Sequence, residues 1–240
     1  MQHIAKIGSV VLSLALLLLL VSCSPQRREY LERVQALESG ETGRIDQAAV
    51  EELEAHIKEL QSEVEELTAS TEKLGTYYKM LAVDFFDAGM FGPALDYFEK
   101  ALYIYPENHV LYYYAGVSTA RIAKTRQTQQ ELTNALLRAE EFYLEALRID
   151  ADYRDALYAL GVLYVFELNT PERGIPYLED LAAMDETRSD VRFVLARAYA
   201  ALGEFTAAAA SYREIIAIDP DSEAAANAQR LLTVLEGDTP

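Results

Sequence analysis

The segment that decides the fold is residues 78–106, which read YKMLAVDFFDAGMFGPALDYFEKALYIYP. It contains two runs of small and large apolar residues at helical spacing: Tyr78-x2-Leu81-Ala82-x2-Phe85 and Ala94-x3-Phe98-x2-Ala101. Apolar residues three and four positions apart share one face of an α-helix. Gly89 and Pro93 lie between the runs, as expected for a residue that ends one helix and a residue that starts the next. The segment therefore predicts two helices joined by a short turn.

The same arrangement recurs three times further along the chain. The recurrences are Tyr112-x2-Ala115-Gly116 with Ala139-x3-Tyr143-x2-Ala146, Leu157-x2-Leu160-Gly161-x2-Tyr164 with Gly174-x3-Leu178, and Leu195-Ala196-x2-Tyr199 with Ala208-x3-Tyr212. These spacings resemble the tetratricopeptide-repeat pattern W-x2-L-G-x2-Y…A-x3-F…P, with Tyr78 in place of Trp in the first unit. The resemblance implies an all-α solenoid of about four helix-turn-helix units, within residues 75–222. The expected units and cap are 75–108, 109–153, 154–188, 189–222 and a C-terminal capping helix and tail at 223–240.

Two units depart from the repeat pattern. The second has eleven additional residues between its helices, and it carries Thr128-x-x-Glu131, a capping-box signature. We expect two lengthened helices with a tight turn near Gln127. The third unit has one extra residue and places Pro176 where the interior of a helix is expected. This proline predicts a kink or a late helix start.

Residues 1–22 have the features of a bacterial lipoprotein signal peptide. Lys6 precedes an apolar run from Val10 to Val21 that is too short to cross a bilayer comfortably. The run ends in Leu20-Val21-Ser22-Cys23, which resembles a lipobox and implies cleavage before Cys23 and acylation of that residue. An uncleaved membrane anchor and an ordinary secretory signal are the alternatives. The placement of the chain's one cysteine at the end of the apolar run favours lipidation.

The lipobox resemblance also implies a cellular location. Ser24, after Cys23, resembles the sorting signal for the outer membrane in enteric bacteria. We therefore expect a protein of the bacterial cell envelope, on the periplasmic face of the outer membrane rather than at the inner membrane. Residues 23–45 would form a lipidated spacer.

A heptad pattern occupies residues 46–74, with Asp46 as the expected helix N-cap. Its apolar stripe is Val50, Leu53, Ile57, Leu60, Val64, Leu67, Thr71 and Leu74. β-Branched residues alternating with Leu favour a parallel two-stranded coiled coil, so a homo-oligomer through residues 46–74 is one interpretation. Seven acidic residues between Glu51 and Glu66 argue against a tight homodimer. The other interpretation is that this helix packs along the first repeat as a cap.

Composition excludes several classes of function. The formal net charge of -18 repels phosphate backbones, so nucleic acid is not an expected partner. One Cys and three His residues provide neither a disulfide nor a metal site, and we predict no metal and no cofactor. Asp84 and Asp87 resemble ordinary solvent-facing carboxylates, and adjacent Glu140 and Glu141 cannot form a catalytic pair. The sequence thus predicts a protein that is not an enzyme, without catalytic residues.

The repeat resemblance implies where a ligand would bind. In tetratricopeptide-repeat proteins the first helix of each unit lines a concave groove, and the groove residues expected here are Lys79, Phe86, Tyr113, Arg121, Tyr158, Phe166, Phe193 and Arg197. This set is aromatic and carries three cations, which suits a peptide with hydrophobic anchors and an acidic group. The family's carboxylate clamp for chaperone tails is not expected, because Val83, Val117 and Val162 stand where Asn would be needed.

Two functions follow as hypotheses. The first is a membrane-anchored scaffold for protein–protein interaction in the cell envelope, which binds a peptide or a subunit in the aromatic groove. The alternative is an accessory solute- or ligand-binding component beside an envelope transporter, with Arg121 and Arg197 lining its cavity.

Overall fold

The structure is a computed structural model that describes residues 47–237, with side chains from residue 50 onward. The predicted signal peptide, Cys23, the spacer, Asp46 and residues 238–240 lie outside the described residues. Within the described range all regular structure is helical, and no helix there is both long enough and apolar enough to span a membrane.

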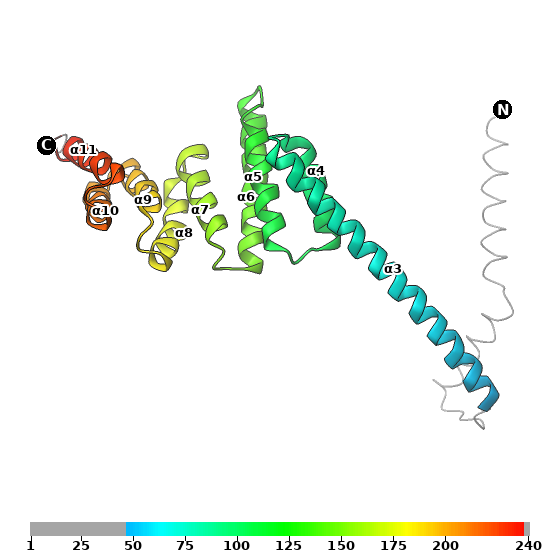
Figure 1. Ribbon diagram of the computed structural model, residues 1–240. Coiled ribbons are helices and arrows are strands. Elements are labelled where there is room, and N and C mark those ends of the chain that lie inside the picture. The colour runs from blue at the N-terminus through cyan, green and yellow to red at the C-terminus, as the bar shows by residue number, and fades with distance from the viewer. Residues whose placement is uncertain (1–46, 238–240) are drawn as a thin grey trace, which may run out of the picture. The chain divides into compact units, whose positions relative to one another are not determined.

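The described helices follow one another with short connections (Figure 1). They are α3 (Gln47–Asp87), α4 (Phe91–Ile104), α5 (His109–Ala123), α6 (Gln129–Ile149), α7 (Arg154–Val162), the π-helical turn η1 (Leu163–Glu167), α8 (Pro171–Met184), α9 (Ser189–Ala201), α10 (Phe205–Ile218) and α11 (Glu223–Gly237). From α4 to α11 each helix packs against the next one along the chain. The predicted fold class is confirmed for the described residues: they form an all-α solenoid of helix-turn-helix units with the tetratricopeptide-repeat arrangement, and the N-terminal part of α3 extends from its first unit as an amphipathic helix.

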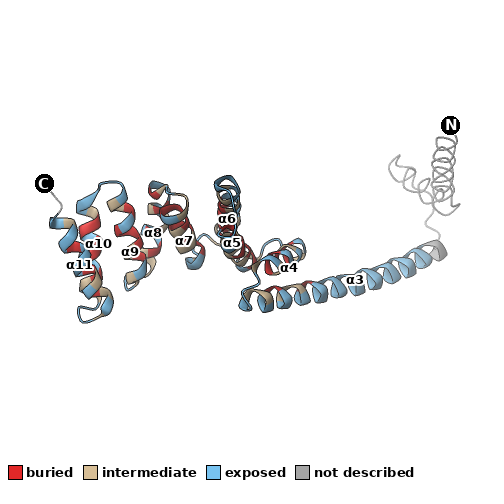
Figure 2. Cartoon of the chain, turned by 90° about the horizontal axis from the view of Figure 1, so that it is seen from above, coloured by how far each residue is buried: buried red, intermediate tan, exposed pale blue. Residues whose placement is uncertain are grey.

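The chain divides into two units between Glu66 and Leu67, and the repeats lie in the second unit. The C-terminal part of α3 is the first helix of the first repeat, because the rings of Tyr78 and Phe85 lie 6.0 and 5.6 Å from the ring of Tyr97 on α4. The other first helices form one continuous layer, since α5 contacts α7 and α7 contacts α9. Buried residues line the seams between these helices (Figure 2).

Glycine allows the paired helices of the third repeat to approach closely. A Cβ atom added to Gly161 on α7 would lie 2.4 Å from a methyl carbon of Leu178 on α8. One added to Gly174 would lie 3.1 Å from the carbonyl oxygen of Gly161. Contacts as short as the first do not occur between non-bonded carbon atoms, so a larger residue at position 161 would displace Leu178 where these two helices cross.

The eleven-residue insertion in the second repeat extends mainly one helix. Helix α6 has 21 residues, whereas α4 has 14, and the turn at residues 124–128 includes Gln127. The predicted capping box is confirmed, because the Thr128 hydroxyl oxygen accepts from the Glu131 backbone N–H at 3.2 Å and the Glu131 carboxylate accepts from the Thr128 N–H at 3.3 Å. The tip of this helix pair extends beyond its neighbours (Figure 1).

The extra residue in the third repeat is accommodated by η1. A π-helical turn inserts one residue into an α-helix without ending it, and the Leu168 N–H donates to the Leu163 carbonyl at 2.9 Å, five residues back. The expected late start of the following helix is wrong. Helix α8 begins at Pro171, a favoured first position, and carries Pro176 in its interior.

Candidate peptide-binding surface

All eight residues predicted to line the groove lie on first helices. Lys79 and Phe86 are on α3, Tyr113 and Arg121 on α5, Tyr158 on α7, Phe166 on η1, and Phe193 and Arg197 on α9. The helices that carry the last six residues form the continuous layer described above. The structure sorts the eight side chains into three groups according to their contacts.

The first group joins one repeat to the next. The ammonium nitrogen of Lys79 lies 4.1 Å from the centre of the Tyr105 ring. The rings of Tyr113 and Tyr153 meet edge to face at 5.6 Å, and the guanidinium of Arg188 lies 4.9 Å from the centre of the Tyr158 ring.

Each of these partners lies in the connection that leads into the next first helix. The contacts are therefore cation–π and aromatic pairs between consecutive repeats. They leave Lys79, Tyr113 and Tyr158 half-buried.

The second group packs within the apolar clusters of the solenoid. Phe86 meets Phe91 and Tyr114 edge to face at 5.5 and 5.0 Å, within the core cluster of the first repeats. Phe193 meets Tyr212 edge to face at 6.1 Å, within the last cluster. Both side chains are partly buried, so their main physical role is packing.

The third group is exposed and consists of Phe166, Arg121 and Arg197. The side chain of Phe166 is 52% exposed, an unusual state for a large aromatic residue. Lys124, at the end of α5, forms an ion pair of 2.8 Å with Glu167 of η1. This contact holds η1 against the end of α5, so Phe166 and Arg121 belong to the same end of the first-helix layer.

The π-helical turn positions Phe166. Because each π turn holds more residues than an α turn, it changes the direction in which the following side chains project, and such turns are frequent at functional sites. The adjacent residues of η1, Tyr164 and Val165, are buried.

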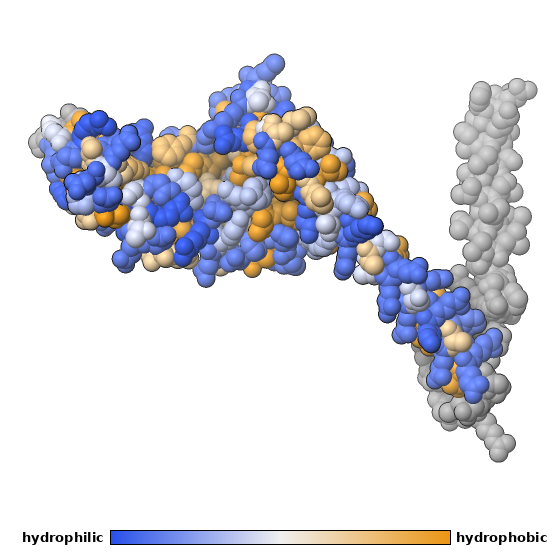
Figure 3. Space-filling view, in the orientation of Figure 1, coloured by the Kyte–Doolittle hydropathy of each residue, from blue (hydrophilic) through white to orange (hydrophobic). Residues whose placement is uncertain are grey.

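Figure 3 shows apolar residues around α4 and α5 and again near α7, between hydrophilic stretches.

Burial raises the pKa of two tyrosines of this surface above the ordinary Tyr value. The pKa of Tyr113 is raised by burial and then by the negative charge of Asp155. The pKa of Tyr158 is raised by burial and then by Asp190, while Arg188 opposes the shift. Both hydroxyl groups are neutral at physiological pH, as an unperturbed Tyr with a pKa of about 10 also is, and they can donate and accept hydrogen bonds.

A buried polar cluster that spans three elements was not predicted from the sequence. Glu140 on α6 is only 7% exposed, and its carboxylate accepts a hydrogen bond of 2.7 Å from the Tyr164 hydroxyl. Arg173 on α8 forms an ion pair with the same carboxylate and lies 4.3 Å from the centre of the Tyr164 ring. No local sequence signal identifies this cluster, because its members lie 24 and 33 residues from Glu140.

The carboxylates and histidine considered above occupy ordinary positions in the described part of the chain. Asp84, Asp87 and Glu141 are exposed or partly exposed at the surface, and Glu140 is engaged in the buried cluster. Over residues 50–237, no three His, Cys, Asp or Glu side chains are placed to hold a metal ion. His109 lies 3.6 Å from the Asp150 carboxylate and packs on the Tyr153 ring at 4.7 Å.

Comparisons with known proteins agree with the fold. Residues 165–232 match a family model described as tetratricopeptide repeat. A TPR repeat-containing protein of Borreliella burgdorferi is 27% identical over 132 residues, which cover 55% of this chain. The aligned region spans only 57% of that relative's length.

Several solved structures share the architecture. MamA superposes with a TM-score of 0.57 at 21% identity, over 68% of this chain and 82% of that chain. A thermophilic TPR protein from Thermus thermophilus superposes with a TM-score of 0.53 at 17% identity, over 66% and 79% of the two chains. YrrB, described as a TPR protein with an unusual peptide-binding site, gives a TM-score of 0.51 at 20% identity, over 67% and 86%. At these identities the similarity concerns the fold alone.

Proposed function

We propose that this protein is a non-enzymatic scaffold that binds a peptide segment or protein subunit on its first-helix layer, while acyl chains on Cys23 anchor it in the bacterial cell envelope. The main support for the binding proposal is that the aromatic residue Phe166 is exposed on a π-helical turn, in the same region as the exposed cation Arg121. Exposed aromatic and Arg side chains are the residue types that most often contribute binding energy at protein interfaces.

The charged side chains of the first-helix layer indicate the chemistry of its partner. The chain carries a formal net charge of -18, yet the layer presents Arg121 and Arg197 as exposed cations. A partner that offers an apolar side chain to Phe166 and a carboxylate to an Arg residue matches this surface. The two Arg residues lie on α5 and α9, with α7 between them, so they suit an extended ligand better than a small solute.

The anchor proposal rests on the sequence around Cys23. A single acyl chain gives weak membrane binding, whereas several chains on one lipoprotein N-terminus give a stable anchor. The acidic surface cannot replace it, because anionic lipids repel a negatively charged protein. We place the protein on the periplasmic face of the outer membrane because Ser24 follows Cys23.

The binding proposal is tested by substitutions of exposed residues, which leave the core intact. We expect Phe166→Ser combined with Arg121→Glu to remove at least one protein that co-purifies with the full chain from its own cells. Tyr103→Ser with Lys100→Glu is the matched control, because Tyr103 is 90% exposed, Lys100 is also exposed, and both residues lie on the second helix α4. Equal partner recovery from both variants, at unchanged melting temperature, would refute the proposed surface.

The anchor proposal is tested separately with Cys23→Ser. We expect this variant to lose labelling by a palmitate analogue and to move from the outer-membrane fraction to the soluble fraction. Ser22→Ala, which keeps the cysteine and a small residue before it, is the control and stays labelled. Retention of the label in Cys23→Ser would show that this cysteine is not the lipidation site.

A further inference from the structure

Helix α3 carries a long apolar stripe on its surface. The exposed fractions rise from 37% at Val50 and 44% at Leu53 to 53% at Ile57 and 59% at Leu60, and they reach 61% at Val64 and 70% at Leu67. Large apolar side chains at successive turns of one helix form a patch of the kind that marks a protein interface. Figure 2 shows how exposed this part of α3 is.

The residue types of the stripe specify its occupant. Taking Val50 as heptad position a, the a positions hold Val50, Ile57, Val64 and Thr71, and the d positions hold Leu53, Leu60, Leu67 and Leu74. β-Branched residues at a combined with Leu at d favour two parallel strands over other coiled-coil states. The stripe is thus suited to another copy of itself.

The acidic residues of α3 do not oppose this pairing. Five of the seven between Glu51 and Glu66 fall at positions b and c, which point away from a partner helix. Only Glu54 at e and Glu63 at g flank the stripe. In a parallel pair of helices, a residue at position g faces the residue at position e five places later on the other helix. This register places Glu54 opposite Ala49 and Glu63 opposite Thr68. No two carboxylates face each other, which removes the objection raised by the number of acidic residues.

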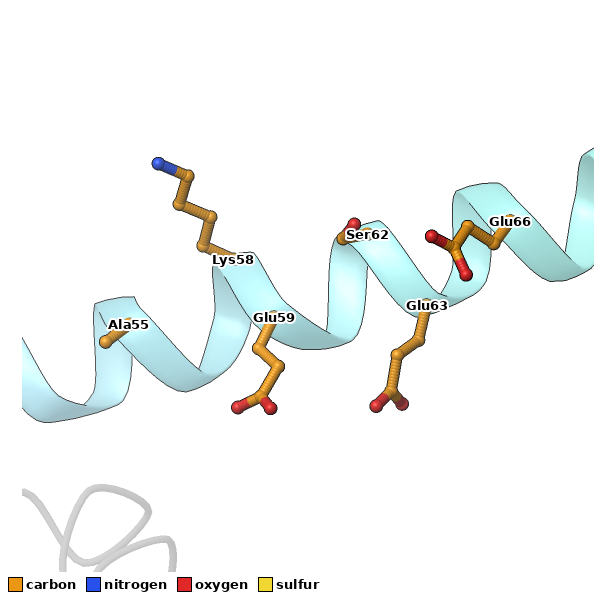
Figure 4. A pocket seen from close by; sticks show the side chains of 6 residues that line it. All are labelled: Ala55, Lys58, Glu59, Ser62, Glu63 and Glu66. Carbon is orange, nitrogen blue, oxygen red and sulfur yellow. The ribbon is translucent and has the colours of Figure 1, made fainter.

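The opposite side of α3 is hydrophilic. Figure 4 shows Ala55, Lys58, Glu59, Ser62, Glu63 and Glu66, which all belong to this one helix. Five of these side chains occupy positions b, c and f, whereas Glu63 at position g lies at the border with the stripe, and no second element of the described chain closes over them. The helix is therefore amphipathic, with one face suited to solvent and the other to a partner.

At its C-terminal end the stripe can be buried against a second helix as far as Leu74, where α4 begins to cover α3. The hydroxyl group of Thr71 donates to the Leu67 carbonyl at 2.9 Å, so this a position enters a seam with its donor satisfied. From Gly75 onward α4 and the residue after it cover the helix, since a Cβ on Gly75 would lie 2.5 Å from the Tyr105 ring. The next a residue, Tyr78, packs on Tyr97. A second helix can therefore follow α3 from Val50 to Leu74.

We infer that the occupant is a second copy of this chain, and that residues 50–74 of two copies form a parallel, in-register two-stranded coiled coil. The seam is about 36 Å long at 1.5 Å per residue, which is short for an isolated coiled coil. Anchoring two copies to one membrane would raise their effective concentration and favour pairing. That last point rests on the proposed lipid anchor, whereas the residue pattern of the seam does not.

Disulfide cross-linking of the full chain in cells tests the inference. In a parallel in-register pair every d residue faces its own equivalent, so we expect Leu53→Cys, Leu60→Cys and Leu67→Cys each to give an oxidised homodimer. The controls are Ser62→Cys, at an outward position, and the parent chain with Cys23 alone. We expect both controls to form little oxidised homodimer. A link at only one of the three d positions would indicate an antiparallel pair and would overturn the inference, as would equal linking at Ser62→Cys.

A second pair of variants tests whether the seam holds the dimer together. Leu60→Glu with Leu67→Glu places carboxylates in the seam, and we expect the purified full chain in detergent to sediment as a monomer. Ser62→Glu with Ala69→Glu adds the same two charges on the opposite face and leaves a dimer. Both variants should keep the parent's solenoid melting transition. A monomeric parent chain with no d-position link, or a dimeric seam variant, would contradict the inference.

Discussion

At the scale of residues, Glu140 shows how a side chain is defined by its surroundings rather than by its neighbours in the chain. It is 7% exposed, while adjacent Glu141 is exposed to solvent. Burial of a carboxylate is costly unless it is paired and hydrogen-bonded, and the Tyr164 hydroxyl and Arg173 provide both interactions. In turn, burial raises the pKa of Tyr164, and its hydrogen bond to Glu140 raises it further. The cluster connects the second repeat to the third.

The first prediction compares two neighbouring substitutions. Glu140→Gln keeps an acceptor for Tyr164 but removes the charge that pairs with Arg173, so we expect the free energy of unfolding to fall by about 1–2 kcal/mol. The expected change is modest because Arg173 is about half exposed and the solvent screens the pair. Glu141→Gln should change stability by less than about 0.5 kcal/mol. Chemical denaturation of both variants measures the difference, and equal effects would show that the cluster contributes nothing specific.

At the scale of elements, the two irregular repeats show how the solenoid accommodates additional residues. The eleven-residue insertion becomes a longer α6 with a capped start, and the single extra residue becomes the π turn η1. The capping box was predictable because its signature is local in the sequence. The π turn was not, because an extra residue can be absorbed at several positions, and the packing of Tyr164 and Gly174 selects one of them.

The capping box gives a prediction about pH. Hydrogen bonds from the Thr128 hydroxyl and backbone N–H lower the pKa of Glu131 in the folded chain. Because the folded pKa lies below the unfolded one, the carboxylate's contribution is present above the ordinary Glu value of about 4.3. It is lost as the pH falls through the lowered pKa. We expect Thr128→Ala to raise the pKa of Glu131 in an NMR titration of its carboxyl carbon.

Thr125→Ala is the control for that titration. The Thr125 hydroxyl donates to the Ile122 carbonyl, so its removal leaves the capping box intact and the pKa of Glu131 unchanged. If Thr128→Ala and the parent chain titrated alike, the capping box would not be the cause of the shift.

At the scale of the whole molecule, the sequence predicted the fold well because the repeat pattern marks buried positions. Ala82, Ala94 and Phe98, which define the first unit, are completely buried. The binding surface was less accessible to prediction. Counting around the first helices places Tyr158 and Phe166 on one surface, but exposure also depends on the next repeat. Arg188 covers part of Tyr158, whereas Phe166 stays 52% exposed.

Photo-crosslinking in cells shows whether the first-helix layer binds a protein partner. A benzoylphenylalanine at Phe166 changes an exposed aromatic residue into a closely similar one, and the same probe at Tyr103 is the control on a second helix. We predict a discrete protein adduct from position 166 and none from position 103. If position 166 gave no adduct, or if both positions gave identical adducts, binding of a protein partner to the first-helix layer would be contradicted.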